Sequence, residues 1–223
     1  MRSTTTTTAL VTQRMPLKDR DRLVTLFSET YGKIVAIARG TQNMNSRRAP
    51  HLDVATLAHF ELMLYDDRPA EIVSCSPKNA YMRMKANLPA TMTALSMLSK
   101  LNSSTADHMP IPGIFPLITN IFSWLDEKES MNKSELNYLM MIFDVKLSTL
   151  IGIFPYDELF TNIQETPFKK LMTDIPEQIA LTRILDAFSM IQQEARVKPR
   201  GSLGQLRARR ALYQVDQNLQ SQQ

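Results

Sequence analysis

Cysteine, glycine and histidine are all scarce in this chain. Its 223 residues include one cysteine, Cys75, six glycines and three histidines. A lone cysteine excludes an intrachain disulfide and a cysteine-rich zinc site. With so few glycines, the sequence contains no phosphate-binding loop of known pattern. His51, His59 and His108 have neither the i,i+4 spacing nor the adjacent glutamate of a metal site, so we expect no metal and no cofactor.

The residues that could act in catalysis also lack neighbouring catalytic partners in the sequence. Asp66 and Asp67 have the composition of a turn, and Asp19 and Asp21 alternate with basic residues. Aspartates in such settings commonly cap turns, and neither pair has a histidine nearby to act as a catalytic partner. We expect Cys75 to be a buried thiol and the protein not to be an enzyme. A hydrolase whose acidic residues converge only in the fold stays an alternative.

Long apolar runs are absent as well. No stretch approaches the roughly 18 uninterrupted apolar residues of a membrane span. The N-terminus, Met1-Arg2-Ser3 followed by five threonines, lacks the apolar centre of a secretory signal. The expectation is a cytoplasmic protein without a membrane partner, associated with the nucleoid if it binds DNA.

Charge is distributed unevenly along the chain. Residues 1–80 hold eleven Lys/Arg against eight Asp/Glu, residues 81–195 hold nine against thirteen, and residues 196–223 hold six against one. An acidic middle thus separates two basic ends. This asymmetry hints at a polyanionic partner that contacts the ends.

The first third of the chain is typical of short strands. Runs rich in β-branched residues are separated by polar turns, and Gly32 suits the positive φ of a hairpin. Five short strands with one long connection suit a small barrel. The expected strands are Thr4–Thr12, Arg22–Ser28, Lys33–Arg39, Leu57–Tyr65 and Ala70–Cys75.

After Pro77 the apolar residues follow helical spacing. Pro89 is expected to split the first helical stretch, and Asn132 with Glu135 to cap a later helix. Most of the fourteen methionines lie in this part and are expected to fill its core, with a Met-lined binding groove as the alternative. The expected helices are Lys78–Asn87, Ala90–Leu101, Ile114–Asp126, Asn132–Ile151 and Asp174–Glu194.

These patterns predict an α+β protein. Residues 1–76 would form an OB-fold β-barrel that binds nucleic acid, and residues 77–197 an all-α domain without a zinc finger. Residues 198–223 would form a basic tail that ends in a glutamine-rich stretch with the composition of disorder.

Basic residues are the best candidates for a binding site. On a small barrel, strand ends and loops place side chains along one groove, which can follow a phosphate backbone. The available aromatics are few, which favours backbone contact over base readout. The alternative is a solvated surface. The candidates are Arg14, Lys18, Arg20, Arg22, Lys33, Arg39, Arg47 and Arg48, with Arg196, Lys198 and Arg200 as a second contact.

Several of these residues stand in a pattern that resembles a known family. The segment Asp21–Lys33 reads DRLVTLFSETYGK, Ile37–Gly40 reads IARG, and Ser46–Arg48 reads SRR. Together with Phe60–Tyr65 (FELMLY), this order resembles the N-terminal domain of the bacterial recombination mediator family RecO. The resemblance is dense over residues 14–76. Beyond that, only the order of the helices and the segment 152–157, GIFPYD, resemble the family.

The resemblance implies a function. It implies an OB-fold followed by a helical domain, ATP-independent binding and annealing of single-stranded DNA, and binding of duplex DNA as an extension. The partners it implies are RecR and the C-terminal tail of single-stranded-DNA-binding protein, with which the protein would load the RecA recombinase. It also implies that Arg22, Lys33, Arg39, Arg47 and Arg48 contact DNA, whereas Arg14, Lys18 and Arg20 rest on position and charge.

The chain departs from the family pattern in two places. Many members carry four zinc-binding cysteines in the helical domain, but residues 155–168 contain none here, so zinc is excluded. The segment Met15–Arg20 is also more basic than the family's usual sequence. A second interpretation therefore stays open, in which the acidic, Met-rich helical domain is a protein-interaction scaffold and the barrel binds no nucleic acid.

Overall fold

The computed structural model describes residues 2–41, 49–153 and 158–173, together with residues 175, 176, 186 and 188. The chain divides into two compact units. The first comprises Met1–Ser130 and Leu147–Phe154, and the second comprises Met131–Lys146 and Pro155–Gln223. The strands and the first three α-helices belong to the first unit.

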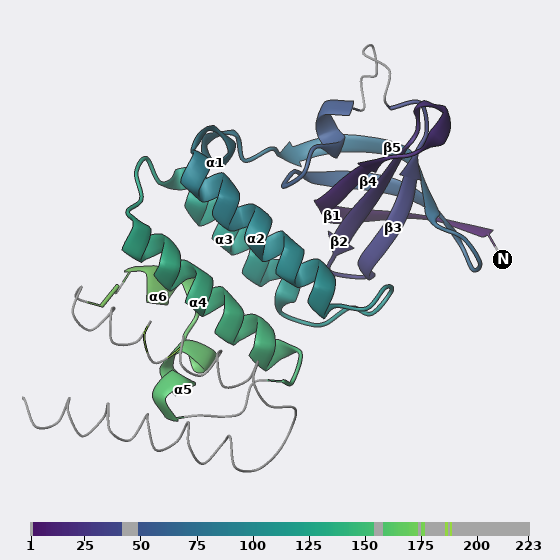
Figure 1. The fold of residues 1–223 in the computed structure, drawn as a ribbon. Coiled ribbons are helices and arrows are strands. Elements are labelled where there is room, and N and C mark those ends of the chain that lie inside the picture. The colour runs from purple at the N-terminus through teal and green to yellow at the C-terminus, as the bar shows by residue number, and fades with distance from the viewer. Residues whose placement is uncertain are drawn as a thin grey trace, which may run out of the picture. The chain divides into compact units, whose positions relative to one another are not determined.

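Five strands form a closed barrel in the order β1-β2-β3-β5-β4 (Figure 1). Neighbouring strands are antiparallel except β3 and β5, which are parallel. This arrangement confirms the predicted OB-fold, a five-stranded Greek-key barrel, and the α+β class. The strands are β1 (Arg2–Pro16), β2 (Arg22–Ser28), β3 (Gly32–Ala38), β4 (Leu57–Tyr65) and β5 (Ala70–Asn79).

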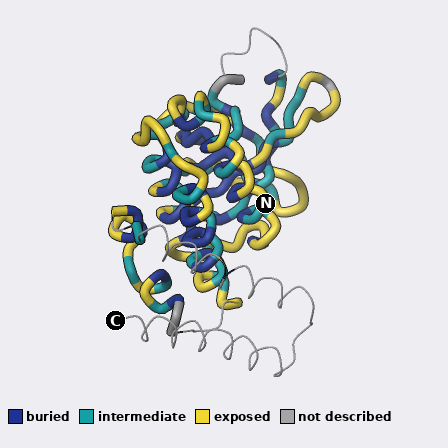
Figure 2. The backbone as a smooth tube through the Cα atoms, turned by 60° about the vertical axis from the view of Figure 1, so that its left-hand side comes forward, coloured by how far each residue is buried: buried dark blue, intermediate teal, exposed yellow. Residues whose placement is uncertain are grey.

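Alternation along the strands builds the barrel core. In β3 the side chains of Ile34, Ala36 and Ala38 are buried, while the residues between them are half-buried. Residues two apart in a strand share a face, so these three point inward. Buried residues from all five strands join them, and Figure 2 colours the buried parts of the backbone dark blue. The interior of the barrel, as formed by the described strands, is therefore filled with side chains.

The strand predictions were accurate at turns and less so at outer ends. β2 and β4 have the predicted bounds, and Gly32 has the expected positive φ of 64°. β1 is longer at both ends, and β5 continues to Asn79, three residues beyond the expected domain boundary. A side chain at Gly32 would meet the backbone of Met109 at 2.4 Å, so this position needs glycine for space as well as for its φ.

The first unit also contains α1 (Met82–Ala86), α2 (Leu88–Ser104) and α3 (Ile114–Glu127). The predicted break at Pro89 is wrong by two residues. Asn87 separates α1 from α2, and its Oδ1 accepts a hydrogen bond from the Ala90 amide at 3.1 Å. Pro89 lies in the first turn of α2, where its missing N–H costs no helical hydrogen bond.

The second unit contains most of α4 (Lys133–Leu150), with α5 (Glu158–Glu165) and α6 (Phe168–Thr173). The predicted cap of α4 is confirmed. The Asn132 side chain accepts from the Glu135 amide at 2.8 Å, and the Glu135 carboxylate accepts from the Asn132 amide at 2.9 Å. The helix predicted over residues 174–194 and the basic tail lie almost entirely outside the described residues. Among the described helices, none is both long and apolar enough to cross a membrane.

Candidate nucleic-acid interface

The turn between β1 and β2 carries two exposed residues of the predicted basic set. It contains the 3-10 helix η1 (Lys18–Arg20), and the Leu17 amide closes it by donating to the Asp21 carbonyl at 2.8 Å. Lys18 and Arg20 are exposed. Within the described part of the chain, neither side chain has a hydrogen-bond or ion-pair partner. Their charges are therefore available to an external anion.

Arg14 and Arg22 flank the same turn. Arg22 begins β2 and pairs with Pro16 of β1 and Ala38 of β3, and its side chain is half-buried. Arg14 lies two residues before the end of β1. The structure thus brings four predicted basic residues to one end of the barrel, and we call Arg14, Lys18, Arg20 and Arg22 the turn cluster.

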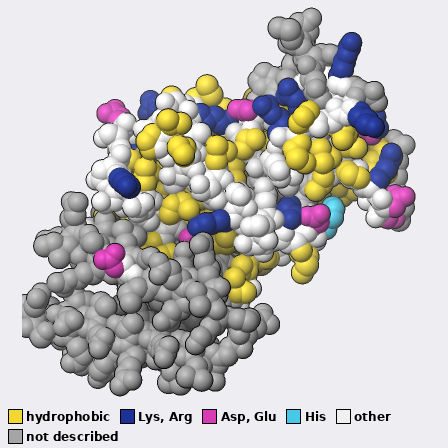
Figure 3. Space-filling view, viewed as in Figure 1, with side chains coloured by type: hydrophobic (Ala, Val, Ile, Leu, Met, Phe, Trp, Pro, Cys, Tyr) yellow, Lys and Arg dark blue, Asp and Glu magenta, His cyan; other side chains and the backbone are white. Residues whose placement is uncertain are grey.

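An aliphatic strip lies beside the turn cluster on the outer face of the barrel. Met15 pairs with Leu23 of β2, which pairs with Ile37 of β3. Met15 is 43% exposed and Leu17 is 40% exposed. Hydrophobic side chains are visible on this face of the barrel, with lysine and arginine around them (Figure 3). OB-folds bind oligonucleotides on the face of strands 2 and 3 and on the loops that join strands 1–2 and 4–5.

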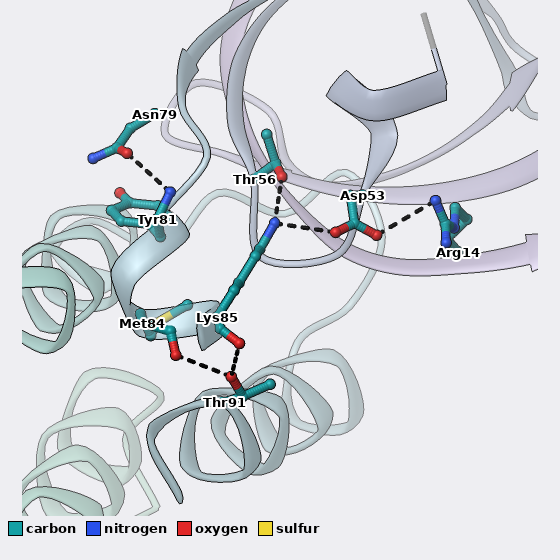
Figure 4. Close-up of polar contacts among 8 residues, drawn as sticks. All are labelled: Arg14, Asp53, Thr56, Asn79, Tyr81, Met84, Lys85 and Thr91. Atoms are coloured by element: carbon teal, nitrogen blue, oxygen red, sulfur yellow. Dashed lines mark hydrogen bonds and ion pairs between the residues drawn. The ribbon is translucent and has the colours of Figure 1, made fainter. Parts of the chain in front are cut away.

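Arg14 forms an ion pair with the loop before β4. Asp53 lies 3.4 Å from the Arg14 guanidinium and 3.2 Å from the Lys85 ammonium of α1. Lys85 also donates to the Thr56 hydroxyl at 2.8 Å. Figure 4 shows Asp53 between the two basic side chains. Arg14 is therefore partly neutralised, and Asp53 connects the barrel to α1.

Arg39 is exposed, but its guanidinium pairs with two carboxylates. Its Nε donates to Glu71 of β5 at 2.6 Å, and its Nη1 lies 3.8 Å from Asp21. The hydrogen bond to Glu71 is the main cause that raises the pKa of Arg39 above its usual value. Asp21 also accepts from the Gly40 amide at 2.7 Å. Asp21 and Arg39, both in the sequence motif, therefore link the β1–β2 turn to the end of β3 and to β5.

Lys33 does not lie on the open surface. Its side chain is 15% exposed, and its ammonium contacts Asp107 at 3.1 Å. It donates to the carbonyls of Asn102 at 3.0 Å and Thr105 at 2.6 Å, at the C-terminal end of α2. A cation at this end of a helix satisfies carbonyls that lack helical partners. Lys33 thus holds α2 against the barrel, and its charge is unavailable to DNA.

The remaining basic candidates lie outside the described residues. These are Arg47, Arg48, Arg196, Lys198 and Arg200. Their expected DNA contacts stay predictions.

Aromatic side chains contribute little to this surface. Phe27 and Phe60 are each 1% exposed, and the half-buried Tyr31 hydroxyl lies 2.6 Å from that of Thr5. The guanidinium of Arg68, in the β4–β5 turn, lies 3.6 Å from the centre of the Tyr65 ring. Sequence reasoning had not singled out Arg68, although its place between β4 and β5 of an OB-fold is a usable signal.

The first unit is similar to proteins of one family. Residues 1–74 match the family described as "Recombination protein O N terminal". The barrel of this chain is therefore similar to the N-terminal domain of RecO proteins. This match confirms the resemblance carried by the DRLVTLFSETYGK and IARG segments.

Full-length relatives extend the similarity beyond the barrel. A DNA repair protein RecO of Desulfitobacterium hafniense is 30% identical over 148 residues, which are 66% of this chain and 51% of that protein. The protein of the same name from Geobacter metallireducens is 27% identical over 146 residues, 62% of this chain and 58% of its own length. One from Bacillus mycoides is 23% identical over 155 residues, 67% of this chain and 58% of its own. The chain thus matches little more than half the length of these relatives.

Proposed function

We propose that this protein acts in DNA repair as a recombination mediator of the RecO type, and that its barrel binds single-stranded DNA at the turn cluster. The observation that carries the proposal is the pair Lys18 and Arg20, exposed and without partners in the described chain, at an OB-fold loop that commonly binds oligonucleotides. The match of residues 1–74 to the N-terminal domain of recombination protein O supports it.

Binding would depend chiefly on phosphate contacts. Lys18 and Arg20 supply cations, and the aliphatic strip supplies a surface for sugars and base faces. Because phosphate contacts carry no sequence information, we expect weak sequence preference. Among the described aromatic residues of the barrel, Phe27 and Phe60 are buried and the Tyr65 ring already packs against Arg68, so stacking would contribute little.

The mediator role needs no chemical step from this chain. We propose that the protein holds and anneals single strands without ATP and binds duplex DNA more weakly. RecR and the C-terminal tail of single-stranded-DNA-binding protein would be its partners in loading RecA. Annealing of complementary oligonucleotides coated with that protein, measured with and without RecR, tests this part separately from DNA binding.

Fluorescence anisotropy with a labelled oligonucleotide tests the interface. Each phosphate contact on a single strand contributes about 0.7 to the slope of log affinity against log salt. Lys18→Gln combined with Arg20→Gln should therefore reduce that slope by about 1.4. The expected loss of affinity at low salt is at least about tenfold, which corresponds to about 1.4 kcal/mol.

A matched charge removal elsewhere makes this test specific. Lys169 and Lys170 of α6 are exposed, and Lys169→Gln with Lys170→Gln removes the same charge from the second unit. This control should keep the wild-type slope. Equal losses in both double variants would show that net charge alone drives binding, and no binding by the wild type at low salt would refute the proposal.

A further inference from the structure

The helix α2 has apolar side chains on two opposite faces. Its inward face buries Ala90, Ala94, Met97, Leu98 and Leu101. On the other side Leu88 is 69% exposed, Met92 is 61% exposed and Leu95 is 45% exposed. These three residues follow i, i+4, i+7 spacing, so they form one ridge about 10 Å long.

Met82 of α1 adds to this exposed surface. Its side chain is 68% exposed, and hydrophobic side chains show on the face formed by α1 and α2 (Figure 3). We call Met82, Leu88, Met92 and Leu95 the outer ridge. Single exposed apolar residues need no explanation, but a helix that is apolar on both sides usually has a partner on each.

The segment that carries the outer ridge has no acidic residue. From residue 72 to residue 106 the chain contains Lys78, Arg83, Lys85 and Lys100, and neither Asp nor Glu. Lys85 is engaged by Asp53, whereas Lys78 and Arg83 are exposed. The Asp126 carboxylate, from α3, accepts from the Met84 amide. The exposed charges of this segment at Lys78 and Arg83 are therefore positive, while Asp53 and Asp126 are already engaged by Lys85 and the Met84 amide.

We propose that the outer ridge docks an amphipathic helix of a partner protein, with apolar residues at i, i+4, i+7 spacing and acidic residues beside them. A ridge of side chains on one helix packs into the groove of another. Acidic flanks would complement Lys78 and Arg83. A second copy of this chain would instead bring its own Lys78 and Arg83 against them, and like charges oppose such pairing.

Two designed peptides test the acidic charge and the apolar spacing that we propose for the partner helix. The acidic probe is a fluorescein-labelled, alanine-based helix with leucine at i, i+4, i+7 and glutamate at flanking positions. The basic probe replaces each glutamate with lysine. The full chain should bind the acidic probe at least about tenfold more tightly than the basic one, a difference of about 1.4 kcal/mol. Equal binding of the two probes would overturn the proposal.

Variants of the chain locate the binding surface. Met92→Ser with Leu95→Ser should weaken binding of the acidic probe at least about tenfold. Met109→Ser with Ile153→Ser is the matched control, because Met109 is 60% exposed and Ile153 is 67% exposed, and both are outside the ridge. Arg83→Glu should reduce the preference for the acidic probe even if the serine variant is unstable. Equal loss in the control pair would place the binding elsewhere.

The same variants separate this proposal from other occupants. Sedimentation that shows dimers of the wild type and monomers of the serine variant would assign the ridge to self-association. Ridge-dependent binding to vesicles of phosphatidylglycerol would assign it to a membrane surface. Either result would overturn the proposal. Single-stranded DNA binding should be unchanged in the serine variant, so failure here and failure of the DNA proposal are distinguishable.

Discussion

Two groups of basic residues in this protein have opposite surroundings. Lys33 is 15% exposed and Lys146 is half-buried, and each donates to the carbonyls at the C-terminal end of a helix. Lys18 and Arg20 lie exposed in the β1–β2 turn, with no partner in the described chain. The family resemblance had grouped Lys33 with the residues expected to contact DNA, whereas Lys18 and Arg20 were included for their position and charge. The comparison shows that a basic residue near a binding surface can serve the fold instead.

The largest expected effect is on Lys33. Lys33→Met removes the donor to the Asn102 and Thr105 carbonyls and leaves Asp107 without its ion pair. Removing a charged donor from largely buried acceptors costs about 2–3 kcal/mol. Urea unfolding of the wild type and the variant measures this loss. DNA affinity per folded molecule should not change.

Lys18→Met is the matched control for that experiment. Lys18 is exposed, so its substitution should alter the free energy of unfolding by no more than about 0.5 kcal/mol. Its DNA affinity should fall, the reverse of the Lys33 variant. If Lys33→Met weakened DNA binding without destabilising the fold, the distinction between the two groups would be wrong.

A smaller, pH-dependent effect is expected for Lys146. It donates to the carbonyls of Gln164 at 3.4 Å and Thr166 at 2.8 Å, and burial lowers the pKa of its ammonium. The unfolded lysine keeps a pKa near 10.4, so the folded protein loses this proton first as pH rises. Between the lowered pKa and about 10.4, the free energy of unfolding therefore increases with pH.

Lys146→Met should remove this increase. The stability of the wild type relative to the variant should grow as pH rises from neutral to about 10. Urea titrations at several pH values measure the difference. Lys170→Met, at an exposed position of α6, should give a difference that does not depend on pH. A flat difference for Lys146 as well would mean that this lysine is as hydrated as Lys170.

The smallest effect is expected for Arg39, which belongs partly to each group. It is exposed like the turn residues, yet it pairs with Asp21 and Glu71. Because water and salt screen such pairs, Arg39→Gln should lower the melting temperature slightly, and less so at high salt. Thermal unfolding at two salt concentrations measures this. A large loss of DNA affinity with unchanged stability would move Arg39 into the DNA-binding group.

Local signals in the sequence predicted much of the barrel. The bounds of β2 and β4, the turn at Gly32 and the cap formed by Asn132 and Glu135 are all present. Each depends on residues close together in the chain. Asp107, by contrast, lies 74 residues after Lys33, so no local pattern could show that the two meet.

The helices show a second limit of sequence reasoning. Methionines were expected to fill the helical core, and Met84 and Met97 do, but Met82 and Met92 are exposed. Periodicity identifies the faces of a helix that are apolar. It does not tell which of two apolar faces the rest of the chain will cover, because that depends on how the helices pack.

The parallel contact between β3 and β5 has a consequence for how the barrel moves. It consists of two residue pairs, Ala36 with Ala70 and Ile37 with Glu71, whereas β1 and β4 share nine. Local opening should therefore begin at this seam, beside the pair formed by Arg39 and Glu71. The barrel would then open as a curved sheet with β3 and β5 at its edges. A ligand bound across β2 and β3 would then stay with those two strands as β5 separates from β3.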